Sequence, residues 1–221
     1  MTEIIGDALV DMDGVIADAH EGFRREMIDR YPDVHAQYDV GDSYFPLEAY
    51  APEDQEAALE VLRSEDFFAN LAPMEGMLEG WQQLVSIGLN PRICSAPFPP
   101  SANCIEQKIA WLEREIVPTF GRRVVDRALF TAHKDECSGS ILIDDNPKLG
   151  TVRAMWRWVV YDHMYNRDAP MPRIMGWRDP LLQPIVSGVA LASRDFSHSR
   201  PGQKGTTSAC GESYRIVGQL G

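Results

Sequence analysis

The clearest chemical signal in the sequence is a pair of aspartates, Asp11 and Asp13, placed directly after the apolar run 8–10. In an extended segment, residues two apart project to the same side, so these carboxylates face one way. Gly14 follows and allows the backbone to turn sharply. Paired carboxylates at the end of a buried strand are suited to bind Mg²⁺, which prefers oxygen ligands.

A second pair, Asp144 and Asp145, follows the apolar run 141–143. In α/β proteins, ligands bind at the carboxyl ends of the parallel strands. If the two apolar runs are neighbouring strands, both acidic pairs gather at one edge of the sheet. Carboxylates packed so closely are unfavourable unless a cation neutralises them. The pattern therefore predicts a Mg²⁺ site built from Asp11, Asp13, Asp144 and Asp145, in preference to two unrelated solvated turns.

Two further polar residues complete a candidate catalytic set. Ser95 follows the apolar run 92–94 and can donate its hydroxyl and backbone N–H to a phosphate oxygen. Lys134 precedes the run 141–143 and can neutralise phosphate as a point cation. A serine in a turn and a surface lysine mean little alone. Their order along the chain makes Asp11, Asp13, Ser95 and Lys134 the candidate catalytic residues.

These side chains need a sheet to position them, and the hydrophobic pattern predicts one. Short apolar runs predict strands at residues 8–10, 92–94, 124–130, 141–143 and 158–161, the third being the least regular. Continuous apolar runs are typical of parallel strands covered on both faces. Helical patterns lie between them, at 77–87 and 101–117. The sequence therefore predicts an α/β fold.

The segment 19–73 does not fit this alternation and predicts a small helical insert after the first strand. Residues 1–18 and 74–182 then form the catalytic core. Residues 183–221 are predicted to be a flexible C-terminal tail, because 194–212 are rich in Ser, Gly and charge and lack an apolar period.

Composition narrows the function classes. The chain of 221 residues has a net charge of −12, which disfavours binding to nucleic acid polymers or an anionic membrane. A phosphate-bearing small molecule stays compatible, because a bound cation inverts the local field. The four cysteines form no C-x-x-C pair and are expected to be reduced thiols. Without a signal peptide or a membrane-length apolar run, we expect a cytoplasmic protein; its oligomeric state, a homodimer included, is left open.

The ordered set of Asp11, Asp13, Gly14, Ser95, Lys134, Asp144 and Asp145 resembles the haloacid dehalogenase superfamily of phosphatases. Longer stretches resemble the 5'(3')-deoxyribonucleotidase family within it. These stretches are DMDGVIAD, FFANLAPMEGM, ICSAP, a K-x-x-W step at Lys108 and Trp111, and LIDD. The resemblance extends over most of the region between the first apolar run and the predicted tail.

The resemblance implies a Rossmann-like core, a parallel sheet flanked by helices, with a small helical cap at 19–73. It implies Mg²⁺-dependent hydrolysis of nucleoside monophosphates through an aspartyl-phosphate. By position, Asp11 would be the nucleophile and a metal ligand. Asp13 would be the general acid/base, with its backbone carbonyl also on the metal. Asp144 would be a metal ligand, and Asp145 would support the metal shell.

The same resemblance implies phosphate contacts from Ser95 and Lys134 and places Ala96 and Asn146 near the substrate. The cap can add a stacking wall for the base, because aromatic faces hold bases. Its candidates are Phe45 and Phe68, with Tyr44 beside them and Phe67 more suited to the core of the cap. The sequence departs from the family at three positions. Ala96 stands where the family often has a second residue with a hydroxyl group. Asn146 stands where some members have an arginine, and Ala19 stands where some members have a phenylalanine. The preferred base and sugar are therefore left open.

The residues suit this chemistry without the resemblance. Uncatalysed hydrolysis of phosphate monoesters is so slow that enzymes accelerate it by up to ~10²¹-fold. A carboxylate nucleophile divides the reaction into two easier steps. The prediction is a Mg²⁺-dependent phosphomonoester hydrolase, a 5'-nucleotidase in particular.

Three alternatives stay open. A phosphatase of another small ester, such as a sugar phosphate, would use the same carboxylates with a different cap. A phosphoacceptor signalling domain is disfavoured because the D-x-D pair comes first along the chain and the D-D pair last. A non-catalytic binding module is disfavoured because both Asp11 and Asp13 are present.

Overall fold

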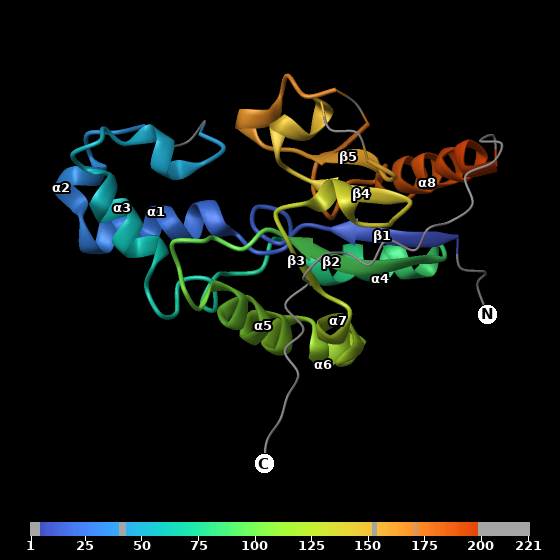
Figure 1. The fold of residues 1–221 in the computed structure, drawn as a ribbon, viewed down its shortest axis with the longest axis horizontal. Helices are drawn as coiled ribbons and strands as arrows, with labels where there is room; N and C mark the ends of the chain where they lie inside the picture. The colour runs from blue at the N-terminus through green and yellow to red at the C-terminus, as the bar shows by residue number, and fades with distance from the viewer. Residues whose placement is uncertain (1–4, 40–42, 152–153, 171, 199–221) are drawn as a thin grey trace, which may run out of the picture.

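The structure is a computed structural model that describes residues 5–39, 43–151, 154–170 and 172–198. Its centre is a six-stranded sheet of order β3-β2-β1-β4-β5-β6, in which every neighbouring pair is parallel (Figure 1). The strands are β1 (Gly6–Val10), β2 (Leu89–Ser95), β3 (Leu129–Phe130), β4 (Ile141–Asp144), β5 (Arg157–Tyr161) and β6 (Arg173–Ile174). The prediction of an α/β fold with a parallel sheet is confirmed.

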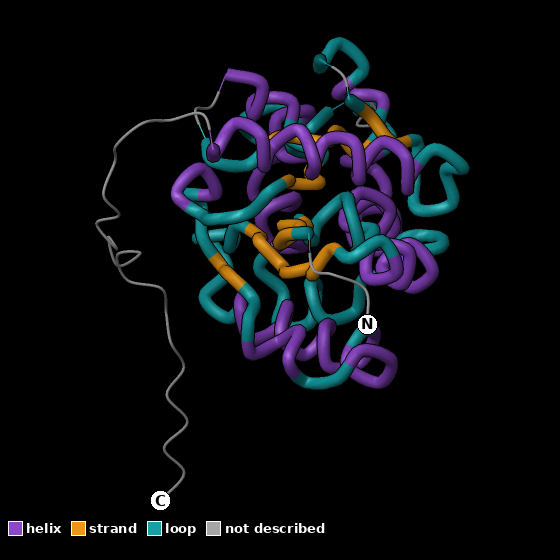
Figure 2. The backbone as a smooth tube through the Cα atoms, turned by 90° about the vertical axis from the view of Figure 1, so that its right-hand side faces the viewer, coloured by secondary structure: helices purple, strands orange, loops and turns teal. Residues whose placement is uncertain are grey.

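Helices surround the sheet, and Figure 2 shows the strands in the interior between them. The α-helices are α1 (Ala19–Arg30), α2 (Pro32–His35), α3 (Gln55–Leu62), α4 (Met77–Ser86), α5 (Cys104–Glu115), α6 (Val117–Phe120), α7 (Arg123–Asp126) and α8 (Leu182–His198). Short 3-10 turns are η1 (Pro46–Ala49), η2 (Lys134–Glu136), η3 (Pro147–Thr151) and η4 (Met164–Asn166). Helices α4 and α8 pack against each other, α4 on β2 and α8 on β4, β5 and β6.

Two strand predictions need correction. Of the apolar run 124–130, only Leu129–Phe130 is a strand. Residues Arg123–Asp126 instead form the helical turn α7, in which Val124 is buried. The two-residue strand β6 was not predicted. It pairs with the end of β5 at the edge of the sheet, and two residues are too few to carry a recognisable hydrophobic pattern.

The predicted flexible tail is wrong over residues 183–198, which form most of α8. Leu182, Val186 and Ala190 are fully buried. Their four-residue spacing places them on one helical face, and the helix packs that face against the sheet. The rest of the predicted tail, 199–221, lies outside the described residues.

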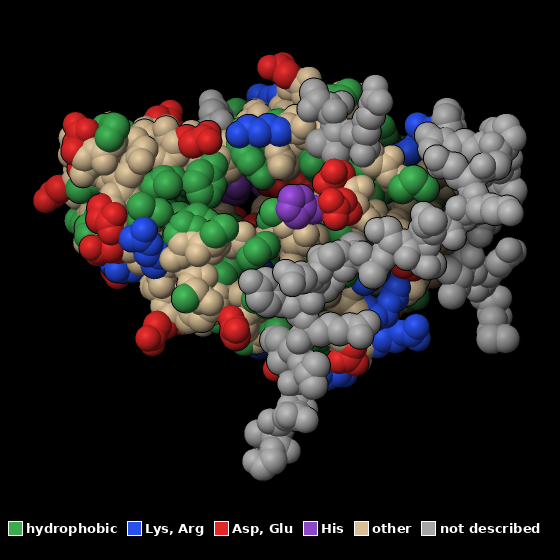
Figure 3. Space-filling model, viewed as in Figure 1, with side chains coloured by type: hydrophobic (Ala, Val, Ile, Leu, Met, Phe, Trp, Pro, Cys, Tyr) green, Lys and Arg blue, Asp and Glu red, His purple; other side chains and the backbone are tan. Residues whose placement is uncertain are grey.

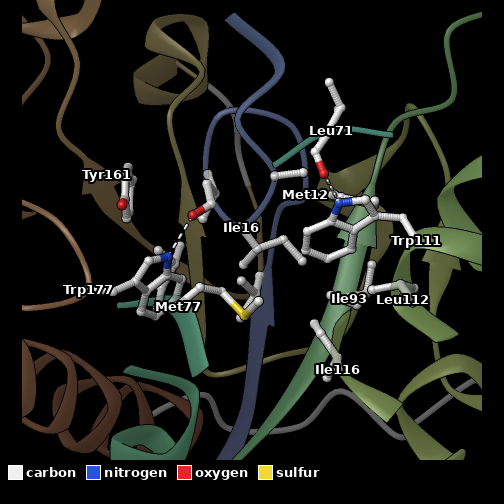
Figure 4. Close-up of a cluster of buried hydrophobic side chains, with 14 of the residues drawn as sticks. Met12, Ile16, Leu71, Met77, Ile93, Trp111, Leu112, Ile116, Tyr161 and Trp177 are labelled. Carbon is white, nitrogen blue, oxygen red and sulfur yellow. Dashed lines mark hydrogen bonds between the residues drawn. The ribbon is translucent and has the colours of Figure 1, made fainter. Parts of the chain in front are cut away.

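Two buried tryptophans tie the loops near the site to the core (Figure 4). The indole of Trp111, on α5, donates to the carbonyl of Leu71 at 2.8 Å. The indole of Trp177 donates to the carbonyl of Val15 at 2.6 Å. Both side chains are fully buried, so these bonds satisfy donors that would otherwise be lost from water. The loop after β1 and the segment that precedes α4 are both held in place this way.

The segment 19–73, called the cap below, leaves and rejoins the core at one place. The amide of Asp18 donates to the carbonyl of Ala72, and the amide of Met74 donates to the carbonyl of Ile16, each at 2.8 Å. The two connecting segments therefore run side by side just beyond the end of β1. In Figure 1, helices α1, α2 and α3 lie to the left of the strands, beyond their carboxyl ends.

No helix in the described ranges is long and apolar enough to cross a membrane. Cys94, Cys104 and Cys137 are buried and form no disulfide. The fourth cysteine, Cys210, lies outside the described residues.

Candidate active site

The sheet topology brings both acidic pairs together. Strands β1 and β4 are neighbours, and their register pairs Val10 with Ile143, so the residues that follow emerge side by side. Oxygens of Asp11, Asp144 and Asp145 lie within 4.8 Å of one another. All three residues are buried, with at most 7% of their surface exposed. From β1 the chain adds β2 and β3 on one side, and it then adds β4, β5 and β6 on the other side. The point between β1 and β4, where the order of strands switches, is where α/β folds bind ligands.

Gly14 shapes the loop that carries the first pair. Its φ of +74° lies in the left-handed region, which side chains disfavour. A Cβ at this position would lie 2.4 Å from Oδ2 of Asp145. Both the backbone conformation and the close approach therefore require glycine.

Lys134 joins the two strand ends. Its Nζ lies 2.8 Å from Oδ1 of Asp11 and 2.6 Å from Oδ2 of Asp144. The indole of Trp156 donates to the Lys134 carbonyl at 2.8 Å and anchors the turn η2. Burial lowers the pKa of Lys134, but the carboxylates of Asp11 and Asp144 outweigh burial and hold that pKa well above its usual value. Lys134 is therefore an ammonium ion.

The carboxylates remain in excess at this point. Burial, with the nearby Asp11, raises the pKa of Asp144 to about 6 against the opposing effect of Lys134. Burial and the charges of Asp144 and Asp11 raise the pKa of Asp145 well above its usual value. Three carboxylates against one ammonium leave a formal excess of two negative charges when all are ionised, which one divalent cation would balance.

The donor set fits such a cation. Oδ1 of Asp11 is buried and accepts no well-directed hydrogen bond from a described residue, although Lys134 lies beside it. Carboxylate oxygens are the ligands that Mg²⁺ prefers. Asp11, Asp144 and Asp145 could therefore hold a magnesium ion.

The fourth predicted ligand, Asp13, has a different partner. Its Oδ2 accepts a hydrogen bond of 2.8 Å from Nζ of Lys108, which also donates to Oγ of Ser95 at 2.9 Å and to the Ala96 carbonyl at 2.7 Å. Oδ1 of Asp13 is buried and has no hydrogen-bond partner among the described residues. The side chain of Asp13 thus lies outside the group of three carboxylates, and the site contains two acid–lysine units.

Sequence reasoning gave Lys108 no role in the site. The available signal is its position on α5, where Cys104, Lys108 and Trp111 are all buried at helical spacing. A lysine on the apolar face of a helix needs a buried acceptor, because an unpaired charge there is strongly unfavourable. Which acceptor it meets depends on the loops after β1 and β2, and the helical pattern does not reveal it.

A pocket of about 400 Å³ opens over these residues, between the cap and the carboxyl ends of the strands. Figure 3 shows the hollow, with hydrophobic side chains on its cap side. Asp11, Asp13, Ser95, Lys134 and Asp145 line its floor. Its lining also contains the predicted substrate-contact residues Phe45, Phe68, Ala96 and Asn146, together with Ala19, Tyr44 and Phe67.

The apolar wall of the pocket is aromatic. The rings of Phe45 and Phe68 lie 6.0 and 6.3 Å, centroid to centroid, from the ring of Phe98. Gln107 fixes Phe68, because its Oε1 accepts from the Phe68 amide at 2.8 Å while its Nε2 donates to the Ser64 carbonyl at 3.0 Å. Phe98 lies after the ICSAP stretch and was not predicted as part of the wall. The wall therefore combines the cap with the loop after β2.

Comparison with known proteins agrees with the motifs. The family model described as "5' nucleotidase, deoxy (Pyrimidine), cytosolic type C protein" matches residues 4–188. A Bordetella pertussis protein whose name describes it as a proposed 5'(3')-deoxyribonucleotidase is 34% identical to this chain. The match covers 77% of this chain and 91% of the Bordetella protein. The mouse mitochondrial 5'(3')-deoxyribonucleotidase is 30% identical over 77% of this chain and 81% of its own. The human cytosolic-type 5'(3')-deoxyribonucleotidase is 27% identical over 85% of this chain and 96% of its own length.

Among solved structures, a haloacid dehalogenase superfamily hydrolase of Geobacter sulfurreducens is similar at a TM-score of 0.45. It is 14% identical and covers 85% of this chain and 98% of its own. The sequence matches confirm the family resemblance predicted from the motifs, and with it the prediction of an enzyme. The chain belongs to the family of deoxy (pyrimidine), cytosolic type C 5'-nucleotidases, hydrolases that act on phosphoric monoesters.

Proposed function

We propose that this nucleotidase is a Mg²⁺-dependent 5'-nucleotidase that hydrolyses (deoxy)ribonucleoside monophosphates through an aspartyl-phosphate on Asp11. The observation that carries the proposal is the buried grouping of Asp11, Asp144 and Asp145 beside Lys134, on the floor of an aromatic-walled pocket. The names of the mouse and human relatives support a nucleotide as substrate.

The contacts divide the roles of the second acidic pair. Both oxygens of Asp144 have partners, since Oδ1 accepts from the Asn146 amide at 2.8 Å and Oδ2 pairs with Lys134. Oδ2 of Asp145 accepts from the Tyr165 hydroxyl, which leaves Oδ1 for the ion. We therefore assign direct metal binding to Asp11 and Asp145, with Asp144 orienting Lys134. This reverses the division expected between Asp144 and Asp145 from the resemblance. The ion would offset the charges of the phosphate and the nucleophile, so that two anions can approach each other.

The first step forms a bond between an Asp11 oxygen and phosphorus and breaks the bond from phosphorus to the ester oxygen. Asp13 gives that oxygen its proton. Oδ1 of Asp13 is the available atom, because no residue in the described part of the chain bonds to it, while Lys108 holds Oδ2. Lys134 and Ser95 line the same pocket as Asp11, which supports a role for both in binding the phosphate oxygens.

In the second step a water molecule attacks the phosphorus of the aspartyl-phosphate. Asp13 takes the proton of this water, the bond from Asp11 to phosphorus breaks, and inorganic phosphate leaves. Positioned acid/base groups of this kind contribute about 10²–10⁴-fold in rate. Lys108 would align Asp13 for both proton transfers, because its ammonium joins Asp13 to Ser95.

The aromatic wall supports a nucleoside in the remaining space. Aromatic faces hold bases by stacking, without reading the base edge. The wall begins at the cap residues Phe45 and Phe68, and the acids lie on the floor. A 5'-phosphate at the floor would then leave the base near the wall. We propose the cytoplasm as the compartment of this protein, by similarity to the cytosolic-type human relative.

The test is phosphate release from a panel of deoxyribo- and ribonucleoside monophosphates and sugar phosphates, with Mg²⁺ and with EDTA. We expect turnover of nucleotides that EDTA abolishes and that Asp11→Asn loses. Trapping of radioactive phosphate on acid-quenched protein would detect the aspartyl-phosphate. Turnover of sugar phosphates alone would refute the substrate, and full activity of Asp11→Asn would refute the nucleophile.

A further inference from the structure

A tyrosine from outside the sequence motifs contacts the acidic group. The hydroxyl of Tyr165 donates a hydrogen bond to Oδ2 of Asp145. Tyr165 lies in η4, the turn after β5, twenty residues beyond Asp145 in the chain. The ordinary pKa of a tyrosine phenol is about 10, so the hydroxyl keeps its proton at neutral pH. The hydroxyl is therefore the donor in this bond, and the carboxylate oxygen is the acceptor. The bond is therefore a fixed restraint on one carboxylate oxygen.

The ring of Tyr165 belongs to a cluster of three aromatic rings. The ring of His163 stacks on it at a centroid distance of 4.9 Å and an angle of 8°, and the ring of His20 lies at 5.0 Å and 27°. The rings of His20 and His163 also lie 5.6 Å from each other, so each ring contacts the other two. Nε2 of His163 lies 2.6 Å from the carbonyl of Gly14, which can only accept, so this nitrogen carries the proton. Nε2 of His20 makes the same kind of bond, at 3.2 Å, to the carbonyl of Tyr44 in the cap. The ring cluster thus joins the cap, the loop after β1 and the turn η4.

The backbone of η4 is tied to Asp145 as well. Nδ2 of Asn166 donates to the carbonyls of Asp145 and Tyr161, each at 2.8 Å. Arg173 donates to Oδ1 of Asn166 at 2.9 Å and to its carbonyl at 2.7 Å. Asn166 is almost completely buried. Since the turn that carries Tyr165 is bound to the backbone of Asp145, the distance from hydroxyl to carboxylate is set by the fold.

Asp145 needs such a restraint. The terminal torsion of an aspartate is broad, so the carboxylate is not fixed by its own rotamer. Repulsion from Asp11 and Asp144 would turn it away from them when no cation is bound. Oδ2 instead lies against Gly14, where a Cβ would come within 2.4 Å, and accepts from Tyr165. With Oδ2 held there, Oδ1 is the oxygen left for a metal.

We propose that Tyr165 is a positioning residue that preorients Asp145 for the divalent ion, with the cluster of the His20, Tyr165 and His163 rings holding its hydroxyl in place. The inference rests on the proposed metal site. It adds a residue that neither the acidic motifs nor the pocket lining contains. Partners that orient metal ligands typically contribute about 10–100-fold in metal affinity.

The test is a Mn²⁺ titration of the whole protein, followed by the electron paramagnetic resonance signal of free Mn²⁺. Tyr165→Phe keeps the ring and removes the hydroxyl, and we expect its dissociation constant to rise about 10-fold or more. Tyr38→Phe is the matched control, because Tyr38 also donates to a carboxylate, Asp54, at 2.6 Å, but in the cap and outside the pocket lining. Its dissociation constant should equal that of the wild type. In phosphate release, the Mg²⁺ concentration for half-maximal rate should rise in Tyr165→Phe, while kcat at saturating Mg²⁺ largely recovers.

An unchanged or lower Mn²⁺ dissociation constant in Tyr165→Phe would overturn the inference while leaving the proposed function intact. If wild-type protein binds no Mn²⁺, the proposed metal site fails and the inference fails with it. Should Tyr165→Phe not fold, His163→Leu provides the second variant, since it removes one stacked ring and keeps the hydroxyl. Weaker Mn²⁺ binding by folded His163→Leu supports the inference, and unchanged binding overturns it.

Discussion

Replacing Lys108 by methionine should damage both stability and catalysis, because this buried lysine pairs with Asp13, the proposed general acid/base. The side chain of Lys108 is fully buried, whereas 32% of the Asp13 side chain is exposed. Removing one member of a buried ion pair costs about 3–5 kcal/mol. Because water can solvate part of the unpaired Asp13 carboxylate, we expect a loss of unfolding free energy at the low end of this range, about 3 kcal/mol. With a urea m-value of about 3 kcal/mol/M, the unfolding midpoint should fall by about 1 M.

The assay pairs urea unfolding, followed by circular dichroism, with phosphate release. We expect kcat/KM of Lys108→Met to fall about 10²-fold, because Asp13 loses its alignment for proton transfer. Lys148→Met is the control, since Lys148 is an exposed lysine that lines the same pocket. Its unfolding midpoint should stay near that of the wild type, as for most surface substitutions.

A double variant separates the unpaired charge from lost packing. Asp13→Asn combined with Lys108→Met removes the stranded carboxylate, so its midpoint should recover toward that of the wild type while activity stays low. The reasoning is refuted if Lys108→Met unfolds at the wild-type midpoint. It is also refuted if the double variant is no more stable than Lys108→Met.

Three more predictions concern the metal site and the pocket. Gly14→Ala should abolish most Mg²⁺-dependent activity, because its Cβ would meet Asp145 at 2.4 Å on a backbone with φ of +74°; activity within a few-fold of the wild type would contradict this. Burial raises the pKa of Asp144 to about 6, above the ordinary 3.8, so the folded protein binds more protons than the unfolded chain between these values. The metal-free protein should therefore lose stability as pH rises through that range, and Mg²⁺ should raise the melting temperature more at a pH above it than at a pH within it; an equal rise would count against the carboxylate group as the ion's site. Phe98→Ala should raise KM for nucleotides more than it lowers kcat, measured by steady-state phosphate release, because it opens the stacking wall away from the acids; an unchanged KM would place the base elsewhere.

The sequence by itself was sufficient for the α/β class and for the meeting of Asp11 with Asp144 and Asp145. Continuous apolar runs are typical of parallel strands that are covered on both faces, and ligand sites collect at the carboxyl ends of such strands. Asp11 and Asp144 could therefore be assigned to one site before their distance was known. Ser95 and Lys134 could be added because each stands next to a strand of the same sheet.

Only the tertiary structure decided how each side chain is paired. Lys108 and Tyr165 come from a helix and a turn that no local pattern connects to the acids, and Lys108 meets Asp13 across 95 positions of the chain. The prediction of a tail over 183–198 rested on the composition of 194–212, whereas the structure shows a helix there that packs its apolar face against the sheet. Periodicity reports which side of an element is buried, since burial depends on the residue's own type. Hydrogen bonds and ion pairs depend on a second residue whose position is set by the packing of the whole chain.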